Sequence, residues 1–337
     1  MTGNPIDIVI PWVDGSDKNW IKSRNYWADK EGREIVSDTS DERFRDWDTL
    51  KYVFRSIDQY MPWIRKVHFV TVGHMPSWLN KDCSRINVVK HEDFIPKEYL
   101  PTFSSHTIEL NMHRIKDLAE QFIYFNDDII ICKKRKPEDY YKKGLPCDYG
   151  ILTALVSSHR YSVMDTALTD IEIINDHFKK KQMLKKNIWK WINLKYGPEL
   201  GKSILMFPWK TISDFAGRHF ETPFLKSTFE EVWTKEEAVL HSTSLHKFRT
   251  RRDVNQWLMR DWQLASGRFI PTTPKGYKYC VIGNDNRLII EAIKSKKYHT
   301  VCINDVTGRN VDDFNKTKEE LIQALQDVFP TKSAFEK

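Results

Sequence analysis

The chain has 337 residues, of which 40% are hydrophobic and 13% aromatic, so it can bury a large core in one or two domains. This composition excludes a largely disordered protein. The formal net charge of +7 suits a nucleic acid, a phosphorylated substrate or an anionic membrane surface, and it does not choose among them.

The cysteines and the N-terminal sequence indicate the cellular compartment of the protein. The spacing of Cys83, Cys132, Cys147, Cys280 and Cys302 includes no CxxC pair, so it predicts neither a disulfide framework nor a structural zinc site. The sequence has neither the pattern of a signal peptide nor an apolar run of about 18 residues that would predict a membrane-spanning helix. We therefore expect reduced thiols and a cytoplasmic location. Attachment to the inner face of the cell membrane is an alternative that the sequence does not decide.

The first predicted element is a short buried strand over Ile6–Trp12, which ends in the turn sequence VDGSD. This strand would deliver Asp14 and Asp17 to a loop at its carboxyl end. Either acid alone is more typical of a turn or a helix cap than of a binding site.

Strands and helices then alternate along the chain. Apolar residues at helical spacing predict a helix within residues 46–62, and β-rich runs predict strands over Lys66–Val72 and Ile86–His91. A helix over Ser105–Gln121 leads into strand material over Phe122–Cys132. The alternation predicts an α/β fold with a mostly parallel central sheet flanked by helices. Ligands of such sheets bind beyond the carboxyl ends of the strands.

The predicted helix over Ser105–Gln121 has two different faces. Its apolar residues fall on one side, whereas His106, Glu109 and His113 share the other. Such a stripe suits a metal site, or a histidine that acts as an acid or base and is oriented by a carboxylate. The alternative is an ordinary solvent-exposed face with a Glu–His pair.

The run FIYFNDDIII places Asn126, Asp127 and Asp128 within an apolar strand, where carboxylates are costly unless they are paired. A further predicted strand over Tyr298–Asp305 also ends in an acid. Carboxylates gathered at strand ends can hold Mg²⁺ or Mn²⁺ against a diphosphate. Three such strand ends in one chain favour a site over three unrelated turns.

The middle of the chain has a different character. Residues 170–196 are helical in pattern and rich in lysine, which is typical of a solvated helix face or of a surface for an anionic acceptor or a membrane. We expect a single domain over 1–337, with a core of about 1–165 and 275–337 and a helical, acceptor-side subregion of about 166–274. Thr317 and Glu320 predict a capping box at the start of a C-terminal helix.

The segment HKFRTRRD supplies Arg249, Arg251 and Arg252, whose guanidinium groups suit phosphate. A basic surface cluster is the alternative. The sequence contains no GxGxxG, GxxxxGK[ST] or GxSxG motif and no nucleic-acid module, which disfavours dinucleotide enzymes, P-loop NTPases, α/β-hydrolases and a nucleic-acid partner.

The segment IDIVIPWVDGSDKNW resembles the first conserved block of the Stealth family of capsular polysaccharide phosphotransferases. A second block runs from Arg43 to Asn80 and continues from Ile86 to Ile131. A looser third block comprises GRHFETPF and HKFRTRRDVNQWL, and the short fourth block is CINDV. The four blocks stand in order and together span nearly the whole chain.

The resemblance implies a core like that of nucleotide-sugar transferases, and a reaction. A sugar-1-phosphate moves from a UDP-sugar to a hydroxyl of an acceptor glycan, which forms a phosphodiester and releases UMP. The resemblance also implies a divalent metal, Mg²⁺ or Mn²⁺, as cofactor. The glycan would be a capsular polysaccharide or a lipid-linked oligosaccharide, with membrane contact and homo-oligomer formation left open.

Carried over by position, the resemblance implies four catalytic residues, Asp14, His113, Arg249 and Asp305. In this hypothesis His113 acts as the base or forms a phosphohistidine, and Arg249, with Arg252 as the alternative match, neutralises the transferring phosphate. Asp127 and Asp128 are the expected metal ligands. The expected substrate contacts are Trp12, Gly15, Asp17, His106, Glu109, Arg114, Asn126, Arg252 and Asn304.

Two other functions remain open at this point. A metal-dependent glycosyltransferase would use the same acids and release UDP. A catalytically silent protein would bind glycans or membranes through the basic middle of the chain.

Overall fold

The computed structural model describes residues 4–32, 46–157, 164–217, 219–305 and 311–337. A five-stranded sheet lies at its centre, in the order β3, β2, β1, β4 and β8. The first four of these strands are parallel, and β8 runs antiparallel to β4 at the edge. Their bounds are β3 Ile86–Lys90, β2 Lys66–Thr71, β1 Ile6–Pro11, β4 Gln121–Tyr124 and β8 Thr222–Leu225.

The alternation of side chains along β1 divides the core into two layers. Ile8 and Ile10 point to one face of the sheet and Val9 points to the other, as the period of two in a strand requires. Helices α2 (Leu50–Tyr60), α13 (Arg287–Lys294) and α14 (Phe314–Val328) cover the first face. The second face is covered by α4 (Ser105–Asn111), α6 (Met164–His177), α10 (Lys226–Lys235), α11 (Glu237–Leu245) and α12 (Gln256–Ala265).

Two smaller sheets complete the strands. The sheet β10–β11–β5 comprises Tyr277–Val281, Thr300–Asn304 and Ile129–Ile131, and β5 pairs antiparallel with β11. The sheet β6–β7–β9 comprises Tyr141–Lys142, Leu145–Asp148 and Ile270–Pro271. The remaining helices are α1 Lys18–Lys30, α3 His91–Phe94, η2 Lys97–Tyr99, η3 Met112–Arg114, α5 Pro137–Tyr140, α7 Lys180–Lys186, α8 Ile188–Trp191, η4 Leu194–Tyr196 and α9 Glu199–Leu205.

The predicted α/β class and the mostly parallel sheet are confirmed. The helical subregion is less separate than its boundaries suggest, because β8 arises within it and completes the central sheet beside β4. The division into core and subregion stays a prediction.

Several local predictions were wrong. The helix from Ser105 stops at Asn111 and gives way to the single 3₁₀ turn η3, after which Asp117 adopts a φ of +65°. The side of α4 that carries His106 and Glu109 is buried, because α12 and α11 pack against this helix. The expected solvent-exposed alternative for this stripe therefore does not hold.

Two more corrections concern helix starts. Helix α14 begins at Phe314, where the side chain of Asp313 accepts a hydrogen bond from the Lys316 N–H at 3.0 Å, so Thr317 lies inside the helix and forms no capping box. The polar stretch after β1 contains the helix α1, which its composition did not predict. Asp17 caps that helix by accepting from the Trp20 N–H at 2.7 Å.

Candidate functional site

The loop after β1 is held in one conformation by its own polar groups. The carboxylate of Asp14 accepts hydrogen bonds from the backbone N–H and the hydroxyl of Ser16, at 2.9 and 2.6 Å. The backbone N–H of Asp14 donates to Nδ1 of His74 at 3.0 Å. This bond places the His74 proton on Nε2, which lies 3.6 Å from Oδ1 of Asp17. Asp14 and Asp17 are therefore positioned before any ligand arrives.

Trp12 and Gly15 lie in the same loop. The Trp12 ring stacks on Phe69 with 5.7 Å between centroids, and its edge meets His74 at 6.4 Å. Gly15 occupies the turn between Asp14 and the start of α1. The predicted strand end is thus confirmed as a half-buried loop at the carboxyl edge of the sheet.

The NDD sequence is a turn that joins two sheets. It leaves the central sheet at the end of β4 and enters β5 of the second sheet, so the expected single strand is in fact two. Protein packed around the carboxyl group of Asp127 raises its pKa to about 7, although the residue reaches the solvent. The neighbouring carboxylates of Asp128 and Asp46 add to the rise.

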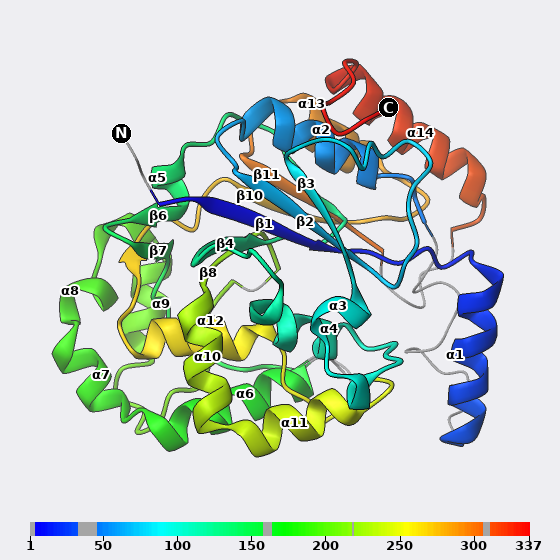
Figure 1. Cartoon of the computed structure of the whole chain (residues 1–337). Helices are drawn as coiled ribbons and strands as arrows, with labels where there is room; N and C mark the ends of the chain where they lie inside the picture. The colour runs from blue at the N-terminus through cyan, green and yellow to red at the C-terminus, as the bar shows by residue number, and fades with distance from the viewer. Residues whose placement is uncertain (1–3, 33–45, 158–163, 218, 306–310) are drawn as a thin grey trace.

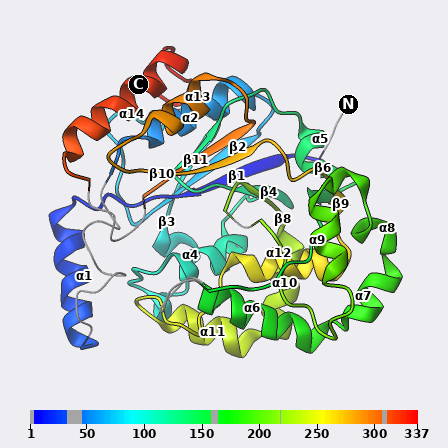
Figure 2. The same ribbon diagram turned by 180° about the vertical axis from the view of Figure 1, so that it is seen from behind.

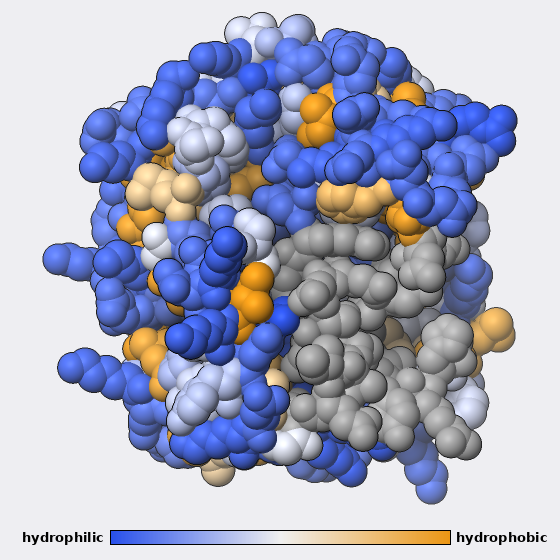
Figure 3. Space-filling model, turned by 90° about the vertical axis from the view of Figure 1, so that its right-hand side faces the viewer, coloured by the Kyte–Doolittle hydropathy of each residue, from blue (hydrophilic) through white to orange (hydrophobic). Residues whose placement is uncertain are grey.

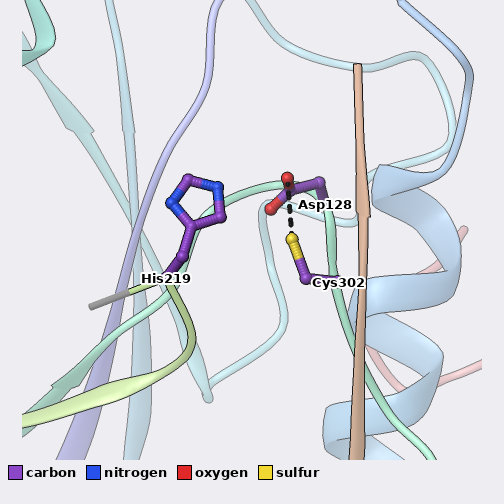
Figure 4. A group of neighbouring side chains, drawn as sticks. All are labelled: Asp128, His219 and Cys302. Atoms are coloured by element: carbon purple, nitrogen blue, oxygen red, sulfur yellow. Dashed lines mark hydrogen bonds between the residues drawn. The ribbon is translucent and has the colours of Figure 1, made fainter. Parts of the chain in front are cut away.

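Asp128 meets a thiol and an imidazole from distant parts of the chain (Figure 4). Cys302, on β11, donates from Sγ to Oδ2 of Asp128 at 3.2 Å. His219 lies opposite, and one ligand atom from each of the three residues fits within 4.8 Å of the others. Oδ1 of Asp128 and Nε2 of His219 are buried and find no hydrogen-bond partner among the described residues. Burial raises the pKa of Asp128, whereas His219 and the thiol oppose the rise.

The third strand end contributes Asp305, whose Oδ2 accepts a hydrogen bond from the Trp47 indole at 2.7 Å. Asp46, beside that tryptophan, has a pKa raised by burial and further by the charges of Asp48 and Asp14. Asp46 therefore lies within electrostatic reach of both the Asp14 loop and the NDD turn. Next to Asp305, the side chain of Asn304 donates to the Tyr279 hydroxyl at 2.5 Å. The three predicted strand ends thus converge on one acidic region.

This acidic region fits a divalent cation. The surrounding protein raises the pKa of both Asp127 and Asp128, so their charged forms are costly there, and a cation would relieve that cost. Oxygen donors suit Mg²⁺ or Mn²⁺, so Asp127, with Asp46 within its electrostatic reach, provides the chemistry of such a site. Asp128 differs, because the imidazole of His219 and the thiol of Cys302 suit a softer ion.

A second polar cluster adjoins the acids on the α4 side. Glu109 accepts from the Tyr124 hydroxyl at 3.2 Å, and Tyr124, at the end of β4, lies within electrostatic reach of both Arg249 and Asp127. Arg249 donates from Nη2 to the Ser105 hydroxyl at 2.5 Å. Tyr124 therefore links the cluster that contains Arg249 to the acidic region.

His106 belongs to the same cluster. Its Nδ1 lies 3.5 Å from Oδ2 of Asp253, whose Oδ1 is 2.7 Å from Nδ1 of His246. Burial lowers the pKa of His106, and the charge of Arg249 adds to the effect. Burial disfavours the charged form of Asp253, but its contacts with both histidines and with Thr250 outweigh burial and hold its pKa well below the usual value.

The structure places His113 apart from the acids. Its ring lies 6.0 Å from the rings of Phe229 and Trp233, and Phe229 also packs on Phe122 at the start of β4. His113 therefore lies towards the amino end of a strand whose carboxyl end carries the acidic turn. Burial lowers the pKa of His113 to about 3, and Arg114 adds to the effect.

Two arginines from the expected substrate contacts also lie apart from the acids. Arg114 covers the Trp233 ring at 4.8 Å, and Arg252 pairs with Glu172 at 2.8 Å on an exposed surface. Of the two arginines that match the third block, Arg249 lies within electrostatic reach of Tyr124 and His106, whereas Arg252 pairs with Glu172 at the surface.

Comparisons with known proteins find relatives that match this chain over nearly its whole length. Residues 4–32 match the Stealth protein conserved region 1, and residues 43–147 match conserved region 2. The chain is 41% identical over 332 residues to the capsular polysaccharide phosphotransferase WcwK of Streptococcus pneumoniae, covering 98% of each chain. It is 36% identical over 333 residues to the receptor polysaccharide phosphotransferase WefC of Streptococcus gordonii, again covering 98% of each. The chain belongs to the Stealth family.

Among solved structures, this Stealth protein resembles the galactosyltransferase LgtC in complex with donor and acceptor sugar analogues. The TM-score is 0.40 and the identity 8%, with 95% of each chain covered. That likeness is too distant to bear on the site. None of the helices in the described ranges combines the length and the hydropathy that a bilayer crossing requires.

Sequence reasoning missed four residues of the Stealth protein's site, and each stood beside a feature that it had noted. His219 lies in the quoted block GRHFETPF, and Cys302 opens the block CINDV. Asp46 and Trp47 belong to the DWD segment at the start of the helix predicted within residues 46–62. Polar residues within these family blocks were the available signal.

Proposed function

We propose that this Stealth protein transfers a sugar-1-phosphate from a UDP-sugar to a hydroxyl of a polysaccharide acceptor. The acceptor oxygen bonds to the phosphorus that carries the sugar, and the bond from that phosphorus to the bridging oxygen breaks. UMP leaves, and a phosphodiester joins the sugar to the glycan. The acceptor proton passes to a base of the protein. The use of a nucleotide sugar would place the reaction in the cytoplasm.

The observation that carries this proposal is the convergence of three strand ends on one acidic region, with an imidazole and an arginine beside it. Asp14 and Asp127 follow neighbouring strands of the parallel sheet, as expected of a ligand site there, and Asp305 joins them from the end of β11 in the second sheet. Membership of a family whose relatives are named polysaccharide phosphotransferases supports the reaction type.

We assign the base to His219 in place of His113. The geometry favours His219 because its Nε2, which has no hydrogen-bond partner among the described residues, lies beside Asp128, whose carboxylate would stabilise the imidazolium formed on proton transfer. His113 lies among aromatic side chains, and its lowered pKa makes it a weak base. The role that the family resemblance assigned to His113 is therefore not the one that its packing favours.

The other residues bind and orient. Arg249 would neutralise charge on the phosphate in transfer, which suits its place within electrostatic reach of Tyr124. Asp14, Asp127 and Asp46 would hold a divalent cation, with Asp128 completing the set or pairing with His219. When bound, that cation would neutralise the diphosphate of the donor. Trp12 and Asn304 border the region where the donor would lie.

One assay separates this function from its rivals. Purified protein is incubated with a panel of UDP-sugars, an acceptor oligosaccharide and Mg²⁺ or Mn²⁺, and the released nucleotide is identified. We expect UMP in amounts that match acceptor consumption. Release of UDP would establish a glycosyltransferase, and release of neither nucleotide with retained glycan binding would establish a silent binding protein.

A further inference from the structure

The positive charge of the chain is concentrated in one segment. Residues 178–210 contain nine lysines and one acid, Glu199, which gives this segment a net charge of +8 against +7 for the whole chain. The other 304 residues therefore sum to −1. The basic character of the protein is a property of this one region and not of the surface in general.

Three of these lysines serve the fold. Lys180 is buried, and its ammonium group donates to the carbonyls of Met206 and, at 3.0 Å, Trp209. The ammonium group of Lys190 donates to the carbonyls of Gly267 and Phe269 at 2.6 and 2.8 Å, and that of Lys195 donates to the carbonyl of Pro271. These contacts hold the segment on the body of the protein. The six that remain are exposed, and they are Lys179, Lys181, Lys185, Lys186, Lys202 and Lys210.

The same segment exposes large apolar side chains. Trp189 is 81% exposed, Leu194 90%, Leu205 74% and Trp209 63%. With the less exposed Ile192 and Ile204, these are six of the fourteen exposed large hydrophobic residues in the described part of the chain, although they occupy only 21 positions. Scattered single apolar residues need no explanation, but such a concentration marks an interaction surface.

The elements that carry these residues lie together. Helices α7, α8 and α9 occupy the end of the molecule opposite α1, and the two opposed views agree on this (Figures 1 and 2). The contact of Lys180 with the carbonyl of Trp209 joins the start of α7 to the segment after α9. The face at the α1 end, outside its grey residues, is mainly hydrophilic (Figure 3).

We propose that this lysine–tryptophan surface, the exposed tryptophans, leucines and lysines of residues 179–210, docks the protein peripherally on an anionic lipid bilayer. Tryptophan rings and leucines enter the interfacial zone of a bilayer, while lysine ammonium groups pair with anionic headgroups. A second copy of the chain fits less well, because two such surfaces would bring like charges together. Docking here leaves the acidic region at the other end of the molecule accessible.

Co-sedimentation with vesicles tests this inference. Full-length protein is mixed with vesicles of phosphatidylcholine alone, or of phosphatidylcholine with phosphatidylglycerol. We expect binding to the anionic vesicles that weakens with added salt, and at least tenfold weaker binding to the neutral ones. The variant Trp189→Ala/Trp209→Ala, and separately Lys185→Glu/Lys186→Glu, should each lose at least tenfold in partition to the anionic vesicles.

Matched controls alter the same residue types elsewhere. Lys81→Glu/Lys97→Glu reverses two exposed charges, and Leu288→Ala truncates a leucine that is 71% exposed. Both controls should bind as the unaltered protein does.

Equal binding by surface variants and controls, or absence of binding by the unaltered protein, would overturn the proposal. It would also be overturned if Trp189→Ala/Trp209→Ala abolished a dimer in analytical ultracentrifugation while vesicle binding stayed unchanged. Turnover of soluble donor and acceptor by the surface variants should be unaffected, so this proposal and the transferase assignment fail independently.

Discussion

The thiol of Cys302 donates a hydrogen bond to the carboxylate of Asp128, with 3.2 Å between Sγ and Oδ2. The backbone strengthens the same junction, since the N–H of Ile303 donates to the carbonyl of Asp128 at 2.9 Å. A strand near the end of the chain thereby fixes an acid that follows β4 of the central sheet. The position of Asp128 depends on the packing of two sheets and not on its local sequence.

This junction predicts a graded response to substitution. Asp128→Asn should lower kcat by on the order of 100-fold or more, because it removes the charge that faces His219. Cys302→Ala should lower kcat by about tenfold through loss of a positioning donor, whereas Cys302→Ser, which keeps a donor, should restore most of that loss. Steady-state kinetics and circular dichroism of the three variants check this. Equal activity in Cys302→Ala and Cys302→Ser would show that the hydrogen bond does not position Asp128.

Substitutions of His219 and His113 should have clearly different effects on kcat. His219→Gln should lower kcat by about 10² to 10⁴-fold with little change in folding, because general-base catalysis is lost. His113→Phe should retain turnover within a few-fold, since a second aromatic ring can pack against Phe229 and Trp233. Rate assays with thermal melts of both variants decide the matter. A melting curve like that of the unaltered protein together with lost turnover in His113→Phe would return the base to His113.

Asp127 should make the folding stability of the metal-free protein depend on pH. Its folded-state pKa of about 7 lies above that of an ordinary carboxyl group, so its ionisation opposes folding. The cost is absent below the unfolded pKa near 4, grows between the two values and is complete above about 7. Asp127→Asn should therefore raise the melting temperature at pH 8 and leave it unchanged at pH 4.

The measurement is a pair of thermal melts in EDTA at each pH. Asp82→Asn, at an exposed loop, serves as the control and should change neither value. An increase in melting temperature for Asp127→Asn that is equal at both pH values would exclude ionisation of Asp127 as its cause.

We expect Asp253 to support catalysis by holding the loop that contains Thr250 and Arg249. Its buried carboxylate accepts from the backbone N–H and hydroxyl of Thr250, at 2.7 and 2.6 Å, one residue after Arg249. Asp253→Asn should destabilise the fold by about 2–3 kcal/mol and raise KM for the donor, because Arg249 loses its support. Denaturant melts and initial rates measure the two effects. Thr250→Ser retains the hydroxyl donor and should behave normally, and an unchanged KM in Asp253→Asn would remove the positioning role.

The sequence predicted more of the sheet than of the site. β-rich runs and turn signals located β1, β2, β3 and β11 to within about one or two residues, because burial in a sheet leaves a local pattern. The acids at the ends of the strands were found for the same reason. The length of α4 could not be predicted, since its apolar spacing continues past Asn111 where the chain turns.

The missed site residues share one physical cause. His219 meets Asp128 only through tertiary packing across 91 positions of sequence, and Trp47 meets Asp305 across 258. No periodicity records contacts of that range. The helix that was expected to carry His113 beside His106 and Glu109 also ends before reaching it.

The central claim is that phosphorus moves with the sugar at the acidic region, and a labelled donor tests it most directly. UDP-sugar carrying ³²P only in the phosphate attached to the sugar is incubated with acceptor glycan, divalent metal and the protein, with Asp128→Asn as the inactive control. The account predicts that the label enters the acceptor while the released nucleotide is unlabelled UMP. Sugar in the acceptor with all of the label in released UDP would contradict it.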